Sequence, residues 1–127
     1  MTRVLVIDDD EINNFTIEAM LDGTPVVGEH EIQDSGDSAL EYLSQAETSE
    51  HFPNYIFVDI NMPGMNGYQF LEIYQKDFYA KYPDTLIYML SSSISESDRE
   101  RSLSYECVTD YISKPLTRDK LHGLIQA

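Results

Sequence analysis

The sequence contains one cysteine, Cys107, and no tryptophan. A single cysteine cannot form an intramolecular disulfide, and there is no CxxC pair to indicate a redox centre or a zinc site. Basic residues are also scarce, because 8 lysines and arginines stand against 23 acidic residues, for a formal net charge of −15. This charge repels phosphate backbones, so we expect no direct binding to nucleic acid.

Long apolar runs are missing as well. No run reaches the roughly 18 residues that a membrane span requires, and the chain starts with a short apolar segment at residues 4–7 instead of a signal peptide. We therefore expect a cytoplasmic protein without a membrane segment. Its 127 residues can bury one core, and no linker, repeat or low-complexity segment divides them.

Short apolar runs alternate with amphipathic stretches about five times along the chain. Runs rich in β-branched and aromatic residues predict buried strands at residues 4–7 and 55–58, and further strands at residues 86–90 and 108–112. The more polar segment 25–32 is expected to form an edge strand. The alternation predicts an α/β fold in which a parallel sheet carries helices on both faces.

Spacings of three and four residues predict the helices between these strands. The first helix should carry the stripe Ile12, Phe15, Thr16, Ala19 and Met20, the second Ala39, Leu40 and Leu43, the third Gly67, Phe70, Leu71, Tyr74 and Phe78, and the last Leu116, Leu121, Leu124 and Ile125. Residues 44–53 are predicted to be a polar connection. The helix predicted within residues 95–104 has few apolar residues to anchor it, which makes it a candidate mobile element.

Polar side chains follow four of the five predicted strands. Asp8 and Asp9 follow the first strand, Asp59 ends the third, Ser91 ends the fourth and Lys114 follows the fifth. Each alone has an ordinary interpretation as a helix cap, a turn residue or a surface charge. Because the carboxyl ends of parallel strands share one edge of a sheet, we expect all five side chains to converge there.

Three carboxylates in one site repel one another. At about 4 Å and an effective dielectric constant near 20, each pair costs on the order of 4 kcal/mol. Lys114 supplies one positive charge, and the oxygen-only ligand set predicts Mg²⁺ or Mn²⁺ with waters completing the coordination shell. The same metal would allow Asp59 to attack a phosphoryl group, because it neutralises oxygens that otherwise repel the carboxylate.

Over essentially its whole length the sequence resembles a response-regulator receiver domain. The resemblance rests on four segments in order: VLVIDDD at residues 4–10, VDINMPGMNG at 58–67, MLSS at 89–92 and YISKP at 111–115. Any one of them is a weak signal, but four at these spacings are specific. The resemblance implies a doubly wound, flavodoxin-like (βα)5 three-layer sandwich whose five parallel strands lie in the order 2-1-3-4-5.

The resemblance also implies a role for each site residue. Asp59 would be the phosphoacceptor, and Asp8, Asp9, Asp59 and the backbone carbonyl of Asn61 would hold the metal. Lys114 would contact the phosphoryl oxygens, and the peptide bond from Lys114 to the following proline would be cis.

Two further residues would form the switch that the resemblance implies. Ser91 would move toward the phosphoryl group, and Tyr111 would turn inward into the space that Ser91 vacates. The sequence departs from the family pattern at Ser91, where threonine is commoner, and at Cys107, where glycine often precedes the fifth strand. Asn61 and Ser93 flank the phosphoryl site and are expected to influence how long the phosphoryl group persists.

The resemblance implies a signalling switch without a turnover substrate, formed by a single receiver domain over residues 1–127 with no output domain. Its phosphodonor would be a histidine kinase or a histidine phosphotransfer protein. A downstream protein would bind the fourth helix, fifth strand and fifth helix, with the chain a monomer or a phosphorylation-dependent dimer. Two alternatives stay open. One is an aspartate-nucleophile phosphatase of haloacid-dehalogenase type, although Ile12 replaces the Thr or Val of that signature, and the other is a receiver-like binding module that works without phosphate.

Overall fold

The computed structural model describes residues 2–92 and 95–125, so Ser93 lies outside the described residues. Strands and helices alternate along the chain as β1 (Thr2–Ile7), α1 (Glu11–Asp22), β2 (Val27–Gln33), α2 (Gly36–Ser49), β3 (Tyr55–Asp59), α3 (Gly67–Asp77), β4 (Leu86–Ser91), α4 (Glu96–Leu103), β5 (Val108–Ser113) and α5 (Arg118–Leu124). All strands pair in parallel, in the order β2-β1-β3-β4-β5. This order confirms the predicted flavodoxin-like fold and the edge position of the second strand.

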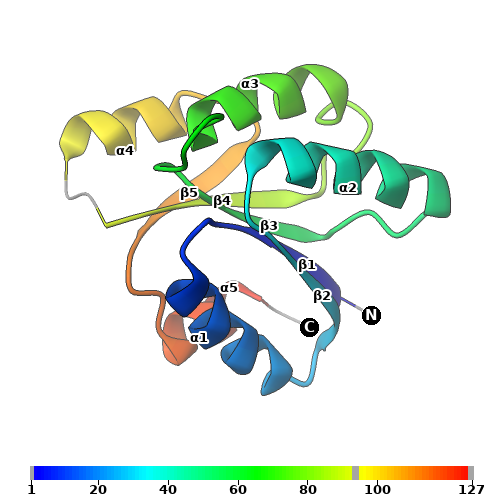
Figure 1. Ribbon diagram of the computed structural model, residues 1–127, viewed down its shortest axis with the longest axis vertical. Helices are drawn as coiled ribbons and strands as arrows, with labels where there is room; N and C mark the ends of the chain where they lie inside the picture. The colour runs from blue at the N-terminus through cyan, green and yellow to red at the C-terminus, as the bar shows by residue number, and fades with distance from the viewer. Residues whose placement is uncertain (1, 93–94, 126–127) are drawn as a thin grey trace.

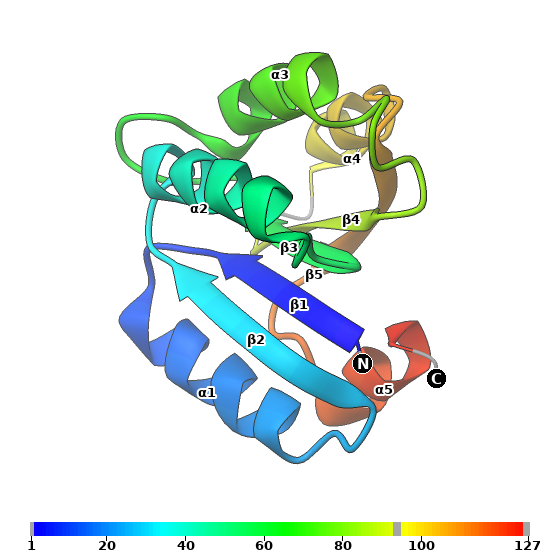
Figure 2. The ribbon, with the colours of Figure 1, turned by 90° about the vertical axis from the view of Figure 1, so that its right-hand side faces the viewer.

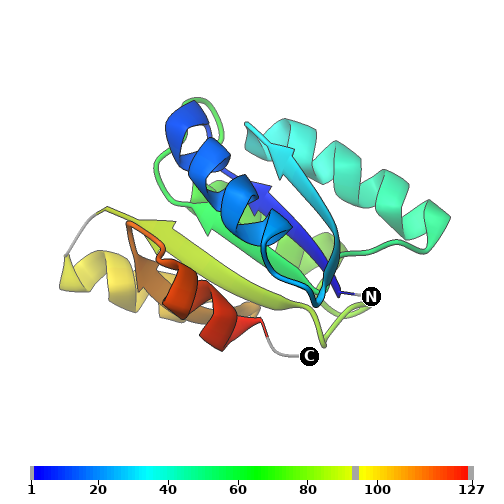
Figure 3. The same cartoon turned by 90° about the horizontal axis from the view of Figure 1, so that it is seen from below.

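The helices form two layers, one on each face of the sheet. α2, α3 and α4 cover one face, and α1 and α5 cover the other (Figures 1 and 2). Viewed from below, α1 and α5 lie on the same side of the sheet (Figure 3). Among the described residues, no helix combines the length and apolar character that crossing a membrane requires.

The sheet divides the core into two clusters because successive side chains of a strand point to opposite faces. In β1, Leu5 and Ile7 belong to the cluster under α2 and α3, whereas Val4 and Val6 belong to the cluster under α1 and α5. Every residue of β3 is buried. Strands that are covered on both faces carry near-continuous apolar runs, and these runs are why β1 and β3 could be predicted from the sequence.

The apolar stripe predicted for the first helix is correct at Met20 and wrong at its other four positions. Ile12 is 81% exposed and Phe15 is 76% exposed, whereas the buried residues of α1 are Ile17, Met20 and Leu21. The inner face continues toward the start of the helix through two asparagines, at spacings of three and four residues. Both asparagine side chains face the acidic end of the sheet. The first turn of the inner helix face therefore carries no apolar residue from which the sequence could predict it.

The second helix is longer than predicted. Residues 44–49, expected to be part of a connection, continue α2 to Ser49, and Ala46 is buried in line with Ala39 and Leu43. The helix ends at Glu50, which has a left-handed backbone conformation with φ 63°. Residues 44–49 are mostly polar because most of them face the solvent. A polar segment of this kind has the composition of a loop, which is why the prediction ended the helix too early.

The fourth helix has few apolar contacts, as expected, but it has polar ones that the sequence did not reveal. Ser102 is buried, and the remaining side chains of α4 are at least partly exposed. The Tyr68 hydroxyl of α3 donates to the carbonyl oxygen of Asp98 at 3.2 Å and lies 3.1 Å from its carboxylate. The Arg101 guanidinium lies over the Tyr68 ring, 4.0 Å from its centre. Tyr68 therefore joins α4 to α3.

Gly67 begins α3 in direct contact with the end of β3. A Cβ atom at this position would lie 2.6 Å from the Asp59 carbonyl oxygen and 2.9 Å from the Ile60 Cα atom. Both neighbours are main-chain atoms, so a side chain at this position would displace the strand end that carries Asp59. The close approach of helix and strand explains the glycine.

We predict that Gly67→Ala lowers the free energy of unfolding by about 2 kcal/mol, as overpacking of a well-packed core does. Urea denaturation followed by circular dichroism measures the change. Gly123→Ala in α5 is the matched control, because a Cβ atom there meets nothing within 4 Å. That variant should gain about 0.5–1 kcal/mol from the better helix propensity of alanine. Equal effects of the two substitutions would contradict the close-approach argument.

Candidate functional site

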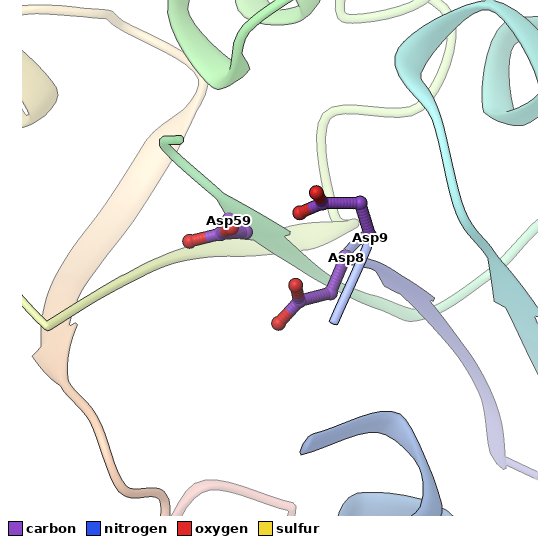
Figure 4. Close-up of side chains that lie close together, drawn as sticks. All are labelled: Asp8, Asp9 and Asp59. Atoms are coloured by element: carbon purple, nitrogen blue, oxygen red, sulfur yellow. The ribbon is translucent and has the colours of Figure 1, made fainter. Parts of the chain in front are cut away.

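The carboxyl ends of the strands bring the predicted acidic residues together. Asp8 follows β1, and Asp59 is the last residue of β3. One carboxylate oxygen each from Asp8, Asp9 and Asp59 lies within 4.8 Å of the other two, and the three side chains extend toward one region beyond the strand ends (Figure 4). The expected convergence of these carboxylates is confirmed.

Lys114 lies between two of these carboxylates. Its Nζ atom is 2.8 Å from Asp8 Oδ2 and 3.3 Å from Asp59 Oδ1. Asp8 is fully buried and Asp59 is 5% exposed, so neither charge is well solvated. Burial lowers the pKa of the Lys114 ammonium, but the hydrogen bond to Asp8 and the charge of Asp59 outweigh burial and raise the pKa overall. One ammonium group thus faces two buried carboxylates and neutralises only part of their charge.

The other predicted residues lie at the same edge of the sheet. The Lys114 backbone N–H donates to the Ser91 carbonyl oxygen at 2.8 Å, and the Lys114–Pro115 peptide is cis, as the resemblance implied. Ser91 is buried at the end of β4. Tyr111 is largely buried in the cluster under α2 and α3, and with residues of α4 and β5 it lines a cavity of about 190 Å³.

The environment of Asp59 favours its protonated form. Burial raises the pKa of Asp59 most, and the negative charge of Asp8 raises it further. The positive charge of Lys114 and a backbone hydrogen bond from Asn61 act in the opposite direction, and the resulting pKa is about 6. Near neutral pH the carboxylate is mostly ionised, but it is less stable than a carboxylate in water.

Two asparagines that were not predicted as site residues hold Asp8. Asn13 Nδ2 donates to Asp8 Oδ2 at 2.7 Å, and Asn14 Nδ2 donates to the Asp8 carbonyl oxygen at 2.7 Å. The Asp10 backbone N–H donates to Asp8 Oδ1 at 3.0 Å, and the Asp10 side chain caps α1. The sequence did contain a signal for these contacts. Two adjacent amides stand at the start of the helix that follows the acidic end of β1.

The cluster of Asp8, Asp9 and Asp59 fits a hard divalent cation. All three ligand atoms are carboxylate oxygens, which Mg²⁺ and Mn²⁺ prefer. Adjacent ligands of octahedral Mg²⁺ are about 3.0 Å apart and opposite ligands about 4.2 Å apart, so the three carboxylate oxygens, which lie within 4.8 Å of one another, would move closer together to share one ion. The excess of buried negative charge over the single Lys114 ammonium favours such an ion.

Residues 4–126 match the family model described as the response regulator receiver domain. The chain belongs to the response-regulator receiver family. Protein PilG of Pseudomonas aeruginosa is 31% identical over 128 residues, covering 98% of this chain and 85% of PilG. The chain spans smaller shares of other curated relatives, 51% of one and 11% of another.

Solved structures agree with this assignment. A two-component response regulator from Cytophaga hutchinsonii has a TM-score of 0.90 and 33% identity, covering 98% of this chain and 93% of that one. The receiver domain of the histidine kinase CKI1 from Arabidopsis thaliana has a TM-score of 0.78 and 26% identity, covering 94% and 85%. Receiver domains are signalling switches of two-component systems that bind a divalent metal and interact with histidine kinases and downstream proteins.

The raised pKa of Asp59 predicts a pH-dependent stability. The stabilisation from protonated Asp59 is fully present below its ordinary pKa of 3.8 and is lost as pH rises through about 6. In metal-free buffer at pH 7, Asp59→Asn should therefore increase the free energy of unfolding by on the order of 2 kcal/mol relative to wild type. Urea denaturation with EDTA between pH 4 and 8 measures the difference, which should vanish near pH 4. A difference that is constant with pH would contradict this origin.

Proposed function

We propose that this chain is a metal-dependent phosphoacceptor, which receives a phosphoryl group on Asp59 from a phosphohistidine protein. The observation that carries the proposal is the buried Asp59 carboxylate beside Asp8 and Asp9, with Lys114 Nζ 3.3 Å from its oxygen. Further support comes from the CKI1 receiver domain, which was solved in complex with Mg²⁺ and BeF₃⁻. The proposed unit is a single receiver domain, acting as a switch without a turnover substrate.

In the proposed transfer, an oxygen of ionised Asp59 attacks the phosphorus atom. The bond between phosphorus and the histidine nitrogen breaks, and the imidazole of the donor leaves and takes up a proton. Lys114 stabilises the phosphoryl oxygens by its positive charge. Asp8, Asp9, Asp59 and the backbone carbonyl of Asn61 would hold Mg²⁺ or Mn²⁺, which when bound neutralises phosphoryl oxygens.

The proposed switch uses residues beside the acceptor. Ser91 moves toward the phosphoryl group and Tyr111 follows it. Tyr111 lines a cavity between α4 and β5 together with Ser95, Glu96, Arg99 and Ser113. A change at Ser91 can therefore reach the surface formed by α4, β5 and α5, where we place the downstream protein partner. The chain would act there as a monomer or as a phosphorylation-dependent dimer.

Phosphorylation with acetyl phosphate and Mg²⁺ tests the function. We expect wild-type protein to gain one phosphoryl group per chain by intact mass spectrometry, and Asp59→Asn to gain none. Asp84→Asn is the matched control, because Asp84 is an exposed aspartate in the connection before β4; it should be labelled like wild type. Sustained multiple turnover would indicate a phosphatase, and bound metal without any labelling would indicate a phosphate-independent binding module.

The exposed apolar side chains of α1 support a docking surface for the phosphodonor. Ile12 and Phe15 lie one helical turn apart beside Asn13, which touches the acidic site. A protein that delivers phosphohistidine to Asp59 must cover this edge of the sheet. A second copy of the chain is a poor occupant because both copies carry a net charge of −15. We therefore propose a donor helix with an apolar face and basic flanks.

Ile12→Ser and Phe15→Ser should each slow phosphotransfer from a purified phosphorylated histidine kinase on the order of 10-fold, since apolar contact area is lost. Labelling by acetyl phosphate should stay unchanged, because that donor needs no docking surface. The kinase for this assay is chosen from a panel of candidates as the one that transfers its phosphoryl group to the wild-type chain fastest. Leu103→Ser, at the exposed apolar residue of α4, is the control and should leave both rates unchanged. Equal slowing with both donors would place the defect in the chemistry instead of in docking.

A further inference from the structure

The Asp8 carboxylate has an unusually complete set of hydrogen-bond donors. Oδ1 accepts from the Asp10 backbone N–H, and Oδ2 accepts both from Lys114 Nζ at 2.8 Å and from Asn13 Nδ2 at 2.7 Å. An ionised carboxylate has about four acceptor positions. Three are therefore filled, and about one is left for a metal.

The two side-chain donors to Oδ2 differ in charge. Lys114 is shared with Asp59, and the proposed chemistry requires its ammonium at the phosphoryl oxygens. A fully buried carboxylate that loses its cation must be stabilised in another way, because an unpaired buried charge is costly. The Asn13 side-chain amide donates to Asp8 Oδ2, and it adds no positive charge that would repel a divalent cation.

We propose that Asn13 is a positioning residue for the metal site. Its amide fixes the orientation of the Asp8 carboxylate toward the cation and keeps one hydrogen bond on Oδ2 when Lys114 turns to the phosphoryl group. This inference deepens the proposed function and rests on it for the identity of the site. It assigns to Asn13 the role that hydrogen-bond partners of metal ligands have in general.

The neighbouring amide provides the contrast. Asn14 donates to the Asp8 carbonyl oxygen and not to the carboxylate. The Asp8 main chain is also held through its N–H, which donates to the Gln33 carbonyl oxygen at 3.0 Å. Loss of the Asn14 amide should therefore leave the orientation of the carboxylate intact.

Binding of Mn²⁺, followed by electron paramagnetic resonance of the free ion, tests the inference without any phosphoryl transfer. We expect Asn13→Ala to raise the Kd on the order of 10-fold and Asn14→Ala to change it less than twofold. Asn13→Leu, which removes the amide at nearly constant volume, should match Asn13→Ala and serves if the alanine variant folds poorly. An unchanged Kd in both Asn13 variants, or an equal loss in Asn14→Ala, would overturn the assignment.

Kinetics with acetyl phosphate provide the second measurement. In Asn13→Ala, the Mg²⁺ concentration for half-maximal labelling should rise by the same factor as the Kd. A lower saturating rate with an unchanged Mg²⁺ requirement would contradict a positioning role. If Asn13 variants weaken Mn²⁺ binding but wild type is never labelled at Asp59, the proposed function fails while the role of Asn13 in the metal site stands.

Discussion

The ion pair that Lys114 makes with Asp8 and Asp59 is the constraint on which the site depends. Two buried carboxylates within reach of each other would be strongly destabilising without a cation between them. The lysine comes from the segment after β5, whereas its partners come from the ends of β1 and β3. The sheet order places β1 next to β3, so the three segments can meet only once the sheet has formed. The charge balance of the site is thus tied to the fold.

Much of the fold could be predicted from the sequence because buried parallel strands leave a plain apolar signal. β3 and β4 were identified as continuous apolar runs, and the polar residues at their ends located the site. The inner face of α1 could not be predicted in the same way, since polar Asn13 and Asn14 lie on it whereas apolar Ile12 and Phe15 are exposed. Their polarity serves Asp8, which is a contact between the helix and the sheet that no local pattern contains.

The length of α2 and the anchoring of α4 were missed for a related reason. Residues 44–49 of α2 are mostly polar, and the buried residue among them is the small Ala46. α4 is held by the hydroxyl of Tyr68, which belongs to a different helix. Within the site, the sequence indicated the acids and the lysine, but the distances and the raised pKa of Asp59 depend on burial, which only the packed structure provides.

The joint between α3 and α4 has a consequence for how α4 can move. A helix held by buried leucines must expose apolar surface to shift, and that exposure opposes motion at about 25 cal/mol per Å². A helix held by a phenol hydroxyl and a stacked guanidinium can exchange these contacts for water at a small net change in free energy. α4 therefore has less buried apolar surface to expose on shifting than α2 or α3, whose inner faces include the buried Leu43 and Leu71.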